Sequence, residues 1–505
     1  MDNEDRWAHP QAAPTGTTVT RAISWMAGAQ VLAQGTWLAS LVVLGALLPP
    51  SSFGTVTTGI VLVTVATRLM GAGTAGSIVS TPNIGPREAR RALLVNVAGG
   101  IVLTAVVVAA AGPVTRTFAR GGDADVLRVL ASSIVLYSLT IVPGALLQKR
   151  MRFKLYASAT AIATLVSSVT AVASAVMGAG VWALVIRQVL YHAVLAGLTW
   201  WMARDLLPRL RRWSPDAEYS SAGRRGGRWF LLLSTADLVA FNADYLVVGW
   251  LTDASQLGLY SLAFTLSFAP LRHFAWQVGG VFFAASAAVQ DPERTGRQMI
   301  RALRMTGVLL LPIVPPALTL APWLLPGVLG DVWSDMVVPF QILLLVGVGH
   351  ALLNVMGEFL AGTGSVEFRA RVSVAWATGM IGALLLLVPA YGIGGAAAAH
   401  AVAFVAVAAA YGVGGSRRLG LHASAVARSL GGVILPVVAQ TLTTTMLLLT
   451  MLAAGFHTHT SQAAAAIAGL GVVTVLWLRT EPSPLKEAIT IAAGALTRSG
   501  GRRVK

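Results

Sequence analysis

Long apolar stretches follow one another along almost the whole chain, and they limit its fold more than any other feature of the sequence. Each stretch is bounded by glycine, proline or charged residues and is long enough for a helix of about 20 residues to cross a bilayer. We therefore predict an all-α polytopic membrane protein with about fourteen transmembrane helices, at residues 21–48, 53–79, 90–112, 125–148, 155–178, 181–203, 229–251, 257–287, 300–325, 336–360, 367–389, 392–414, 430–454 and 461–479.

The composition supports this class of protein. Charged residues make up 11% of the 505 residues, whereas a soluble domain averages about 25%. The chain has no cysteine, which excludes disulfides and thiolate chemistry. It also has no G-x-x-x-x-G-K-[ST] motif, so it carries no phosphate loop of its own for ATP.

Basic residues are concentrated in alternate connections between the predicted spans. Segments such as "PREARR" (86–91) and "QKRMRFK" (148–154) alternate with connections that lack lysine and arginine, such as "LTDASQLG" (251–258). Arg116, Arg120 and Arg128 break the pattern in one connection. Because basic loops stay in the cytoplasm, we expect a multi-pass protein of the cytoplasmic membrane with both termini inside. Most of the basic residues behind the net charge of +17 would then lie on the cytoplasmic face, beside anionic membrane lipids. Because these lipids account for the positive charge, we expect no nucleic-acid partner.

The longest polar connection, 204–228, divides the spans into two halves of six. The predicted organisation is a cytoplasmic tail, an N-terminal lobe, a basic cytoplasmic linker, a C-terminal lobe, two further helices and a basic cytoplasmic tail, at residues 1–20, 21–203, 204–228, 229–414, 415–479 and 480–505.

The two halves contain an internal repeat. "LVVLGALLPPSSFG" (41–54) resembles "YLVVGWLTDASQLG" (245–258), and one shift of 204 residues aligns both glycines of each segment. The same register aligns Arg68 with Arg272. Since each half has six spans, the copies share one orientation. This predicts two lobes related by a pseudo-two-fold axis along the membrane normal, with a central cavity between them.

Several charged residues fall inside the predicted spans. At about 1.5 Å per residue, Arg68, Arg272 and Asp237 lie at similar depths in the inner half of the membrane, and Asp244 lies about 10 Å further out. Asp237 and Asp244 are seven residues apart, which places them on one helix face. A charge at this depth costs at least about 2.5 kcal/mol on insertion scales, so each should face protein, water or an anion.

Two interpretations of these charges remain open. In one, Asp237 neutralises an arginine in a structural ion pair. In the other, the arginines bind an anionic headgroup in the cavity, and the two aspartates balance charge or couple transport to an H⁺ or Na⁺ gradient. Arg187 is a further candidate near the outer end of its span.

Other polar residues point less clearly to function. Glu358 is interpreted as interfacial, and the intramembrane histidines as packed or hydrogen-bonded; these are His192, His273, His350 and His400. No cluster of His, Asp or Glu residues has metal-ligand spacing, and no G-x-S-x-G motif occurs. We therefore predict no metal site, no catalytic residue and no enzymatic activity.

Three segments resemble a known family. They are "VPGALLQKRMRFKLYA" (142–157), "GAGVWALVIRQ" (178–188) and the region 242–292, in which N-x-D-x-L-x-x-G contains Asn242 and Asp244. They are similar to the polysaccharide transporter family, the Wzx-type oligosaccharide flippases of the multidrug/oligosaccharidyl-lipid/polysaccharide superfamily. Trp250 departs from the pattern, because relatives often carry a basic residue there.

The resemblance implies a V-shaped pair of six-helix lobes with two extra helices. It implies that a polyprenyl-diphosphate-linked oligosaccharide moves across the membrane by alternating access, for cell-surface polysaccharide synthesis. Arg68 and Arg272 would bind the diphosphate, as cavity arginines do in related lipid II flippases, and a polysaccharide polymerase and export machinery are expected partners. The alternatives are a drug or small-molecule antiporter of the same superfamily and, with less support from the short outer loops, a glycan-polymerising enzyme.

Overall fold

The computed structural model describes residues 16–80, 86–120, 122–207, 224–272, 292–419 and 423–455, with a few single positions beyond them. Over these residues every regular element is a helix. Residues Met1–Gly227 and Tyr245–Ser261 form one compact unit, called unit 1, and residues Arg228–Asp244 and Leu262–Lys505 form unit 2. The lobe boundaries at 203 and 229 remain predictions. Residues Tyr245–Ser261, a helical hairpin, belong to unit 1, together with the first half of the chain.

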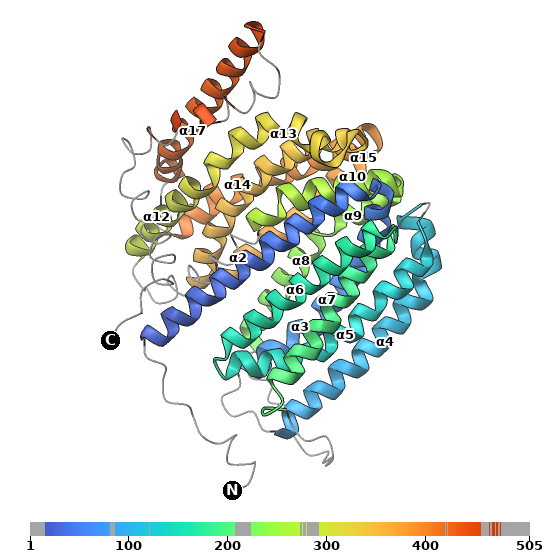
Figure 1. The fold of residues 1–505 in the computed structure, drawn as a ribbon. Coiled ribbons are helices and arrows are strands. Elements are labelled where there is room, and N and C mark those ends of the chain that lie inside the picture. Colours follow the sequence, from blue (N-terminus) through green and yellow to red (C-terminus); the bar gives the residue numbers. More distant parts are fainter. Residues whose placement is uncertain are drawn as a thin grey trace, which may run out of the picture. The chain divides into compact units, whose positions relative to one another are not determined.

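Unit 1 is a bundle of long helices. Its elements are α2 (Gly16–Leu47), α3 (Pro50–Ser80), α4 (Pro86–Phe118), α5 (Ala124–Lys149), α6 (Phe153–Val176) and α7 (Trp182–Met202), joined by most of α9 (Ala243–Leu251) and the first part of α10 (Ala254–Ser267). Helix α5 packs against α3, α4 and α7, and α6 packs against α2 and α7 (Figure 1). Buried aliphatic residues of α3, α4 and α5 form one of its core clusters, including Ile78, Leu93 and Val142.

Unit 2 begins with the end of α8 (Arg224–Ala240). It continues with α12 (Pro292–Leu310), η1 (Leu311–Ile313), α13 (Val314–Leu329), η2 (Asp331–Met336), α14 (Val337–Gly362), α15 (Val366–Ala410), η3 (Tyr411–Gly415), α16 (Ser416–Arg418) and α17 (Ala423–Ala453). Helix α14 packs against α12, α13 and α15. A core cluster there includes Leu271, Leu310 and Leu344.

The helices agree with most of the predicted spans. Over the described residues, ten helices are long and apolar enough to cross a membrane, and one of them, Val366–Arg418, covers both spans predicted at 367–389 and 392–414. The apolar part of α2 described in full, Leu32–Leu47, is shorter. The span at 461–479 and the end of the span at 257–287 lie largely outside the described residues, so the total of fourteen stays a prediction.

A glycine separates the two arms of α15. Gly392 has φ 55° and ψ −135°, a backbone conformation that residues with a Cβ atom avoid. A Cβ atom on Gly395 would lie 2.1 Å from the carbonyl oxygen of Leu387. Residues eight apart in a straight helix are about 12 Å apart along its axis, so the chain folds back at Gly392. The connection predicted between these two spans is therefore present, in a very short form.

The span predicted at 229–251 is long and apolar enough to cross a membrane over Leu231–Leu251, but a two-residue turn interrupts its regular helix. Helix α8 ends at Ala240, Phe241 and Asn242 form a turn, and α9 begins at Ala243. The Asn242 side chain donates from Nδ2 to the carbonyl of Leu238 at 2.7 Å, which satisfies an acceptor that the end of α8 leaves open. This turn lies between Asp237 and Asp244, so the expectation that their side chains share one helix face stays a prediction.

Candidate functional site

A buried cluster of charged side chains surrounds Arg369 in unit 2. Arg369 lies in the first turn of α15, and its Nη2 donates to Oε1 of Glu358 on α14 at 3.0 Å. The two side chains are only 12% and 14% exposed. Arg369 is also the strongest charged neighbour of Asp237 on α8, and Ser373 lies beside that carboxylate. The guanidinium of Arg369 thus pairs with Glu358 and acts electrostatically on a second carboxylate, that of Asp237.

This arrangement gives Asp237 a cationic neighbour other than the two arginines that the sequence suggested. Arg369 lies at the start of the span predicted at 367–389, and Glu358 was interpreted as interfacial. The structure begins α15 at Val366, so Arg369 is helical and its side chain lies in the packed part of the unit. Burial of a charged pair is tolerated when its members satisfy one another, which Arg369 and Glu358 do.

A second buried pair joins Asp244 and His400. The His400 Nε2 and Asp244 Oδ2 atoms are 3.1 Å apart, and the side chains are 1% and 0% exposed. Asp244 lies in the first turn of α9, and His400 in the second arm of α15. The rings of Phe264 and Phe268 lie 5.5 Å and 6.2 Å from the imidazole, centroid to centroid. The pair therefore lies in an apolar, aromatic environment.

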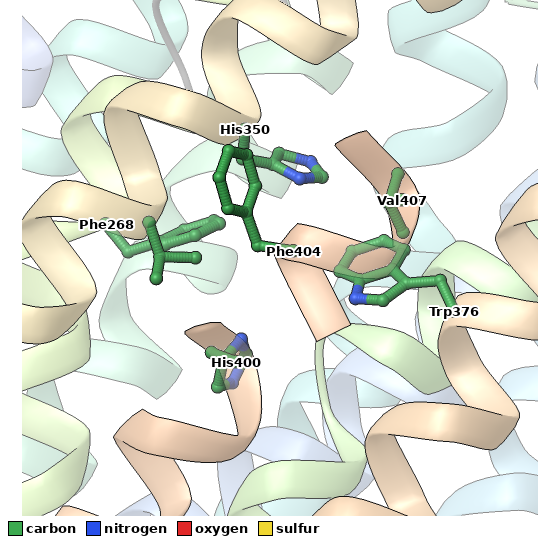
Figure 2. Close-up of a pocket in the computed structure, with 7 residues that line it drawn as sticks. Phe268, His350, Trp376, His400, Phe404 and Val407 are labelled. Carbon is green, nitrogen blue, oxygen red and sulfur yellow. The ribbon is translucent and has the colours of Figure 1, made fainter. Parts of the chain in front are cut away.

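A small cavity adjoins His400 (Figure 2). His350 on α14 and His400 on α15 face it together with aromatic and aliphatic side chains; the lining is Phe268, Val346, His350, Trp376, His400, Phe404 and Val407. The space is sufficient for about one water molecule. Two imidazoles thus border one cavity that can hold a hydrogen-bonding water.

Arg272 lies against the same aromatic group. Its Cζ atom is 4.9 Å from the ring centroid of Phe241, the residue at the break after α8. The Phe241 ring in turn makes edge-to-face contacts with His350 at 5.2 Å and Trp376 at 4.8 Å. Attraction between a guanidinium and an aromatic face contributes about 0.5–2 kcal/mol, so this stack helps to hold Arg272 in the membrane.

Arg68 and Arg187 lie in unit 1. Arg68, on α3, is exposed and acts electrostatically on Tyr137 of α5. Arg187, on α7, is buried; its Nη1 donates to the Ser40 hydroxyl at 3.4 Å, and its Cζ lies 5.8 Å from the Trp37 ring centroid. Arg187 therefore links α7 to α2. Arg68 and Arg272 belong to different units, and their shared role in binding an anion stays a prediction.

The glycines of the internal repeat make a reciprocal contact within unit 1. A Cβ atom on Gly54 of α3 would lie 1.7 Å from the carbonyl oxygen of Ala254, and one on Gly258 of α10 would lie 1.8 Å from that of Pro50. The shift of 204 residues that aligns Gly54 with Gly258 also aligns Pro50 with Ala254. The first turns of α3 and α10 thus cross in direct backbone contact, and each contributes equivalent residues, as two-fold related segments do.

The remaining polar candidates have local partners. His192 contacts Gln188, with 3.2 Å between their side-chain nitrogens, and packs edge-to-face on Tyr137 and Tyr191. This environment confirms that His192 is packed and hydrogen-bonded. His273 lies outside the described residues. Among the residues that the structure describes, no group of three or more His, Asp or Glu side chains could hold a metal ion.

Sequence reasoning missed the pairing partners rather than the polar residues themselves. Glu358 and His400 were among the polar residues noted, but helices α14 and α15 bring these two and Arg369 to the aspartates from more than 100 residues away. One signal is present in the sequence: "GAGVWALVIRQ" (178–188) aligns with "GIGGAAAAHAV" (392–402) at a looser shift near 213 residues, which pairs Arg187 roughly with His400. Both side chains are buried.

The family model and the relatives that match this chain are all named for polysaccharide biosynthesis. The family described as "Polysaccharide biosynthesis protein" matches residues 43–338. The chain is 24% identical over 376 residues to the lipopolysaccharide biosynthesis protein WzxC of Escherichia coli, covering 74% of each chain. It is 24% identical over 361 residues to the succinoglycan biosynthesis transport protein ExoT of Rhizobium meliloti, covering 70% of this chain and 71% of the relative.

Solved structures with a similar fold are membrane transporters. The lipid II flippase MurJ in an inward closed conformation matches with a TM-score of 0.70 and 11% identity, covering 90% of this chain and 98% of MurJ. An inward-facing multidrug transporter of the MATE family matches with a TM-score of 0.56 and 17% identity, covering 79% of this chain and 95% of that one. At these identities the matches concern the fold alone.

Proposed function

Because the chain belongs to the family of polysaccharide biosynthesis proteins, we propose that it is a flippase for a polyprenyl-diphosphate-linked oligosaccharide. One joint observation carries this proposal: the sequence relatives are named for polysaccharide biosynthesis and transport, and the fold resembles a lipid II flippase over nine-tenths of the chain. The cargo would move from the inner to the outer leaflet of the cytoplasmic membrane, and both termini would lie in the cytoplasm.

The two repeat-related arginines are the proposed ligands of the diphosphate. Guanidinium groups donate two parallel hydrogen bonds to phosphate oxygens, and a diphosphate offers such oxygens on both phosphorus atoms. Arg68 is exposed, and Arg272 is only partly buried beside Phe241, so both side chains retain access to a ligand. Asn242, at the helix break, caps α8 and is proposed to help preserve the position of Phe241 under Arg272.

The reciprocal glycine contact supports alternating access. The first turns of α3 and α10 belong to connections that the charge pattern places on the outer side of the membrane. Their close approach would close that side while the cargo enters from the cytoplasm, and their separation would release it. An ion gradient would drive the cycle, and a polysaccharide polymerase and export machinery would receive the cargo.

Lipid analysis after depletion of the protein tests the cargo. We expect a polyprenyl-diphosphate oligosaccharide to accumulate in the inner leaflet, where mass spectrometry of extracted lipids would identify it. A drug antiporter, which the MATE-like fold would also permit, predicts normal lipid-linked sugars and impaired efflux of small molecules instead. An unchanged lipid profile would therefore reject the flippase proposal.

The arginine role predicts a specific loss of transport. Arg68→Ala and Arg272→Ala should each slow flipping of the extracted lipid in proteoliposomes by about tenfold or more, because a lost hydrogen bond to a charged group costs about 1.5–3 kcal/mol and about 1.4 kcal/mol corresponds to tenfold. Arg116→Ala, which removes an exposed arginine at the end of α4, is the matched control. Normal flipping by both variants would remove the arginines from the mechanism.

A further inference from the structure

We propose that a group of polar aromatic side chains in unit 1 binds the sugar residue that is joined directly to the diphosphate of the cargo. This group, called the tyrosine cluster, comes from three helices: Tyr137 of α5, Tyr156 of α6, and Gln188, Tyr191 and His192 of α7. The proposal rests on the proposed flippase function for the identity of the ligand. Its structural basis is the set of hydrogen-bonding groups that the cluster leaves open and its position beside Arg68.

The imidazole of His192 joins the members of the cluster. It packs edge-to-face against the rings of Tyr137 and Tyr191, with centroid distances of 5.9 Å and 5.1 Å. The Nε2 atom of His192 lies 3.2 Å from Nε2 of Gln188. Because the amide nitrogen of glutamine can only donate, the imidazole Nε2 accepts this hydrogen bond, and a neutral imidazole then carries its proton on Nδ1.

Several polar groups of the cluster have no partner in the part of the chain that the structure describes. His192 is only 9% exposed, and its Nδ1 is buried without a hydrogen bond. The hydroxyls of Tyr137, Tyr156 and Tyr191 likewise make no hydrogen bond to another described residue, and these residues are partly exposed. Buried polar groups that serve only packing are normally paired. Water can serve these groups before the cargo binds, and a ligand rich in hydroxyls can replace that water.

The cluster lies close to the depth of Arg68. Lys149 Nζ donates to the carbonyl oxygen of Ile78 at 3.1 Å, so the corresponding ends of α5 and α3 lie together. Counted from this link at about 1.5 Å per residue, Tyr137 lies about 18 Å along α5 and Arg68 about 15 Å along α3.

Two further observations place Tyr137 beside Arg68. The Tyr137 hydroxyl lies 3.3 Å from the position that a Cβ atom on Gly71 would take, and Gly71 is one turn from Arg68 on the same face of α3. Arg68 is also the charged side chain that acts electrostatically on Tyr137. Since the first sugar is bonded directly to the diphosphate, a phosphate bound by Arg68 would bring that sugar to the cluster.

The chemistry of the cluster fits a neutral sugar. A sugar ring has hydroxyls that both donate and accept hydrogen bonds, and its faces carry apolar C–H groups. Tyrosine hydroxyls, an amide and an imidazole N–H match the hydroxyls, whereas the aromatic rings can cover a C–H face. The cluster contains no carboxylate and no amine, so a phosphate would find its cation at Arg68 instead.

A binding experiment with two lipids tests the site. The probes are lipid-linked oligosaccharide extracted from the cells and a polyprenyl diphosphate without sugar, each titrated against the purified full-length protein and followed by native mass spectrometry. We expect wild type to bind the sugar-linked lipid at least about tenfold more tightly, because several hydrogen bonds are added. Arg68→Ala should weaken the binding of both lipids.

Removal of the hydroxyls should affect only the sugar-linked lipid. Tyr137→Phe with Tyr191→Phe keeps both rings, and should lower the affinity for this lipid about threefold to tenfold for each hydroxyl, the size of one neutral hydrogen bond. His192→Phe removes the Nδ1 donor and should have the same selective effect. The affinity for the polyprenyl diphosphate without sugar should stay at the wild-type value.

Two controls separate recognition from packing. Tyr391→Phe removes a hydroxyl from a tyrosine of α15 that is 70% exposed, and it should bind both lipids as wild type does. The unfolding temperature of the Tyr137→Phe, Tyr191→Phe protein should be close to that of wild type. Equal losses for both lipids would assign the hydroxyls to structure, and wild-type affinity for the sugar-linked lipid would show that the cargo contacts only the rings; either result would overturn the site.

A third probe distinguishes this site from the flippase function. Oligosaccharide released from the extracted lipid by mild acid carries the sugars without the diphosphate. If the protein binds it through the tyrosine hydroxyls but does not move the lipid in proteoliposomes, the flippase proposal fails and the sugar site stands. If the protein moves the lipid but binds the sugar-linked and sugar-free lipids equally, the flippase proposal stands and the sugar site is overturned.

Discussion

Arg369 is the single side chain on which the buried charges of unit 2 most depend. Its removal would leave Glu358, 14% exposed, without its ion-pair partner and would take away the cation that acts electrostatically on Asp237. Breaking a buried ion pair by removing one partner costs about 3–5 kcal/mol. We therefore expect Arg369→Ala to lower the unfolding temperature of the purified protein markedly, as measured by thermal unfolding in detergent.

Two comparisons distinguish this effect from a general loss of positive charge. Arg371→Ala removes an arginine two residues away that pairs with Glu367 on the surface, where such pairs contribute about 1 kcal/mol or less. Adding Glu358→Gln to Arg369→Gln should restore part of the stability, because it removes one of the stranded carboxylates. Equal destabilisation by the Arg369 and Arg371 variants would contradict the buried cluster.

Sequence reasoning found most polar residues of the candidate site but few of their partners. Asp237, Asp244 and Arg272 stand out because charge is rare in apolar spans. Their neighbours could not be predicted, since Arg369 and His400 approach through packing of α15, which depends on the three-dimensional positions of several helices. A sequence pattern shows the face of one helix but not which distant helix covers it.

The close crossing of helices α3 and α10 predicts that a larger residue at Gly258 will force the two helices apart. Gly258→Val adds atoms where even a Cβ would lie 1.8 Å from a backbone oxygen, so the two helices must separate. We expect a cysteine placed at Ser52, which is 9% exposed beside the crossing, to react faster with a membrane-impermeant maleimide in this background. Because the chain has no cysteine of its own, the label reports this position alone.

A matched glycine provides the control for that experiment. Gly35 lies within α2, and a Cβ atom added there would meet nothing within 4 Å. Gly35→Ala should leave the reactivity at Ser52→Cys unchanged. If Gly258→Val also leaves the maleimide reactivity at Ser52→Cys unchanged, the crossing of α3 and α10 does not limit access of the reagent to this position.

The elements themselves were largely predictable, and their interruptions were not. Apolar length alone locates most spans, because a bilayer sets the number of residues that a helix needs. The break at Phe241 and Asn242 carries no glycine or proline to announce it. It depends instead on a side chain, Asn242, that replaces a backbone hydrogen bond at the end of α8.

The charge pattern predicts an orientation of the chain in the membrane, and the same labelling chemistry tests that prediction. Single cysteines at Ser51 and Ser334 occupy exposed positions in predicted outer connections, and one at Thr363 occupies an exposed position in a predicted inner connection. We expect the first two to react in intact cells and the third only after the membrane is permeabilised. The reverse pattern would place the termini outside.

The hairpin at Tyr245–Ser261 also has a consequence for biogenesis. Unit 1 includes this hairpin, although 17 residues of unit 2, Arg228–Asp244, are synthesised before it. The first bundle therefore stays incomplete when its sixth long helix, α7, enters the membrane, and the crossing of α3 with α10 can form only after Ser261 has left the ribosome. Until then Ala254 does not cover the backbone at Gly54, and lipid or another part of the chain must occupy a place that the finished protein fills with its own later sequence.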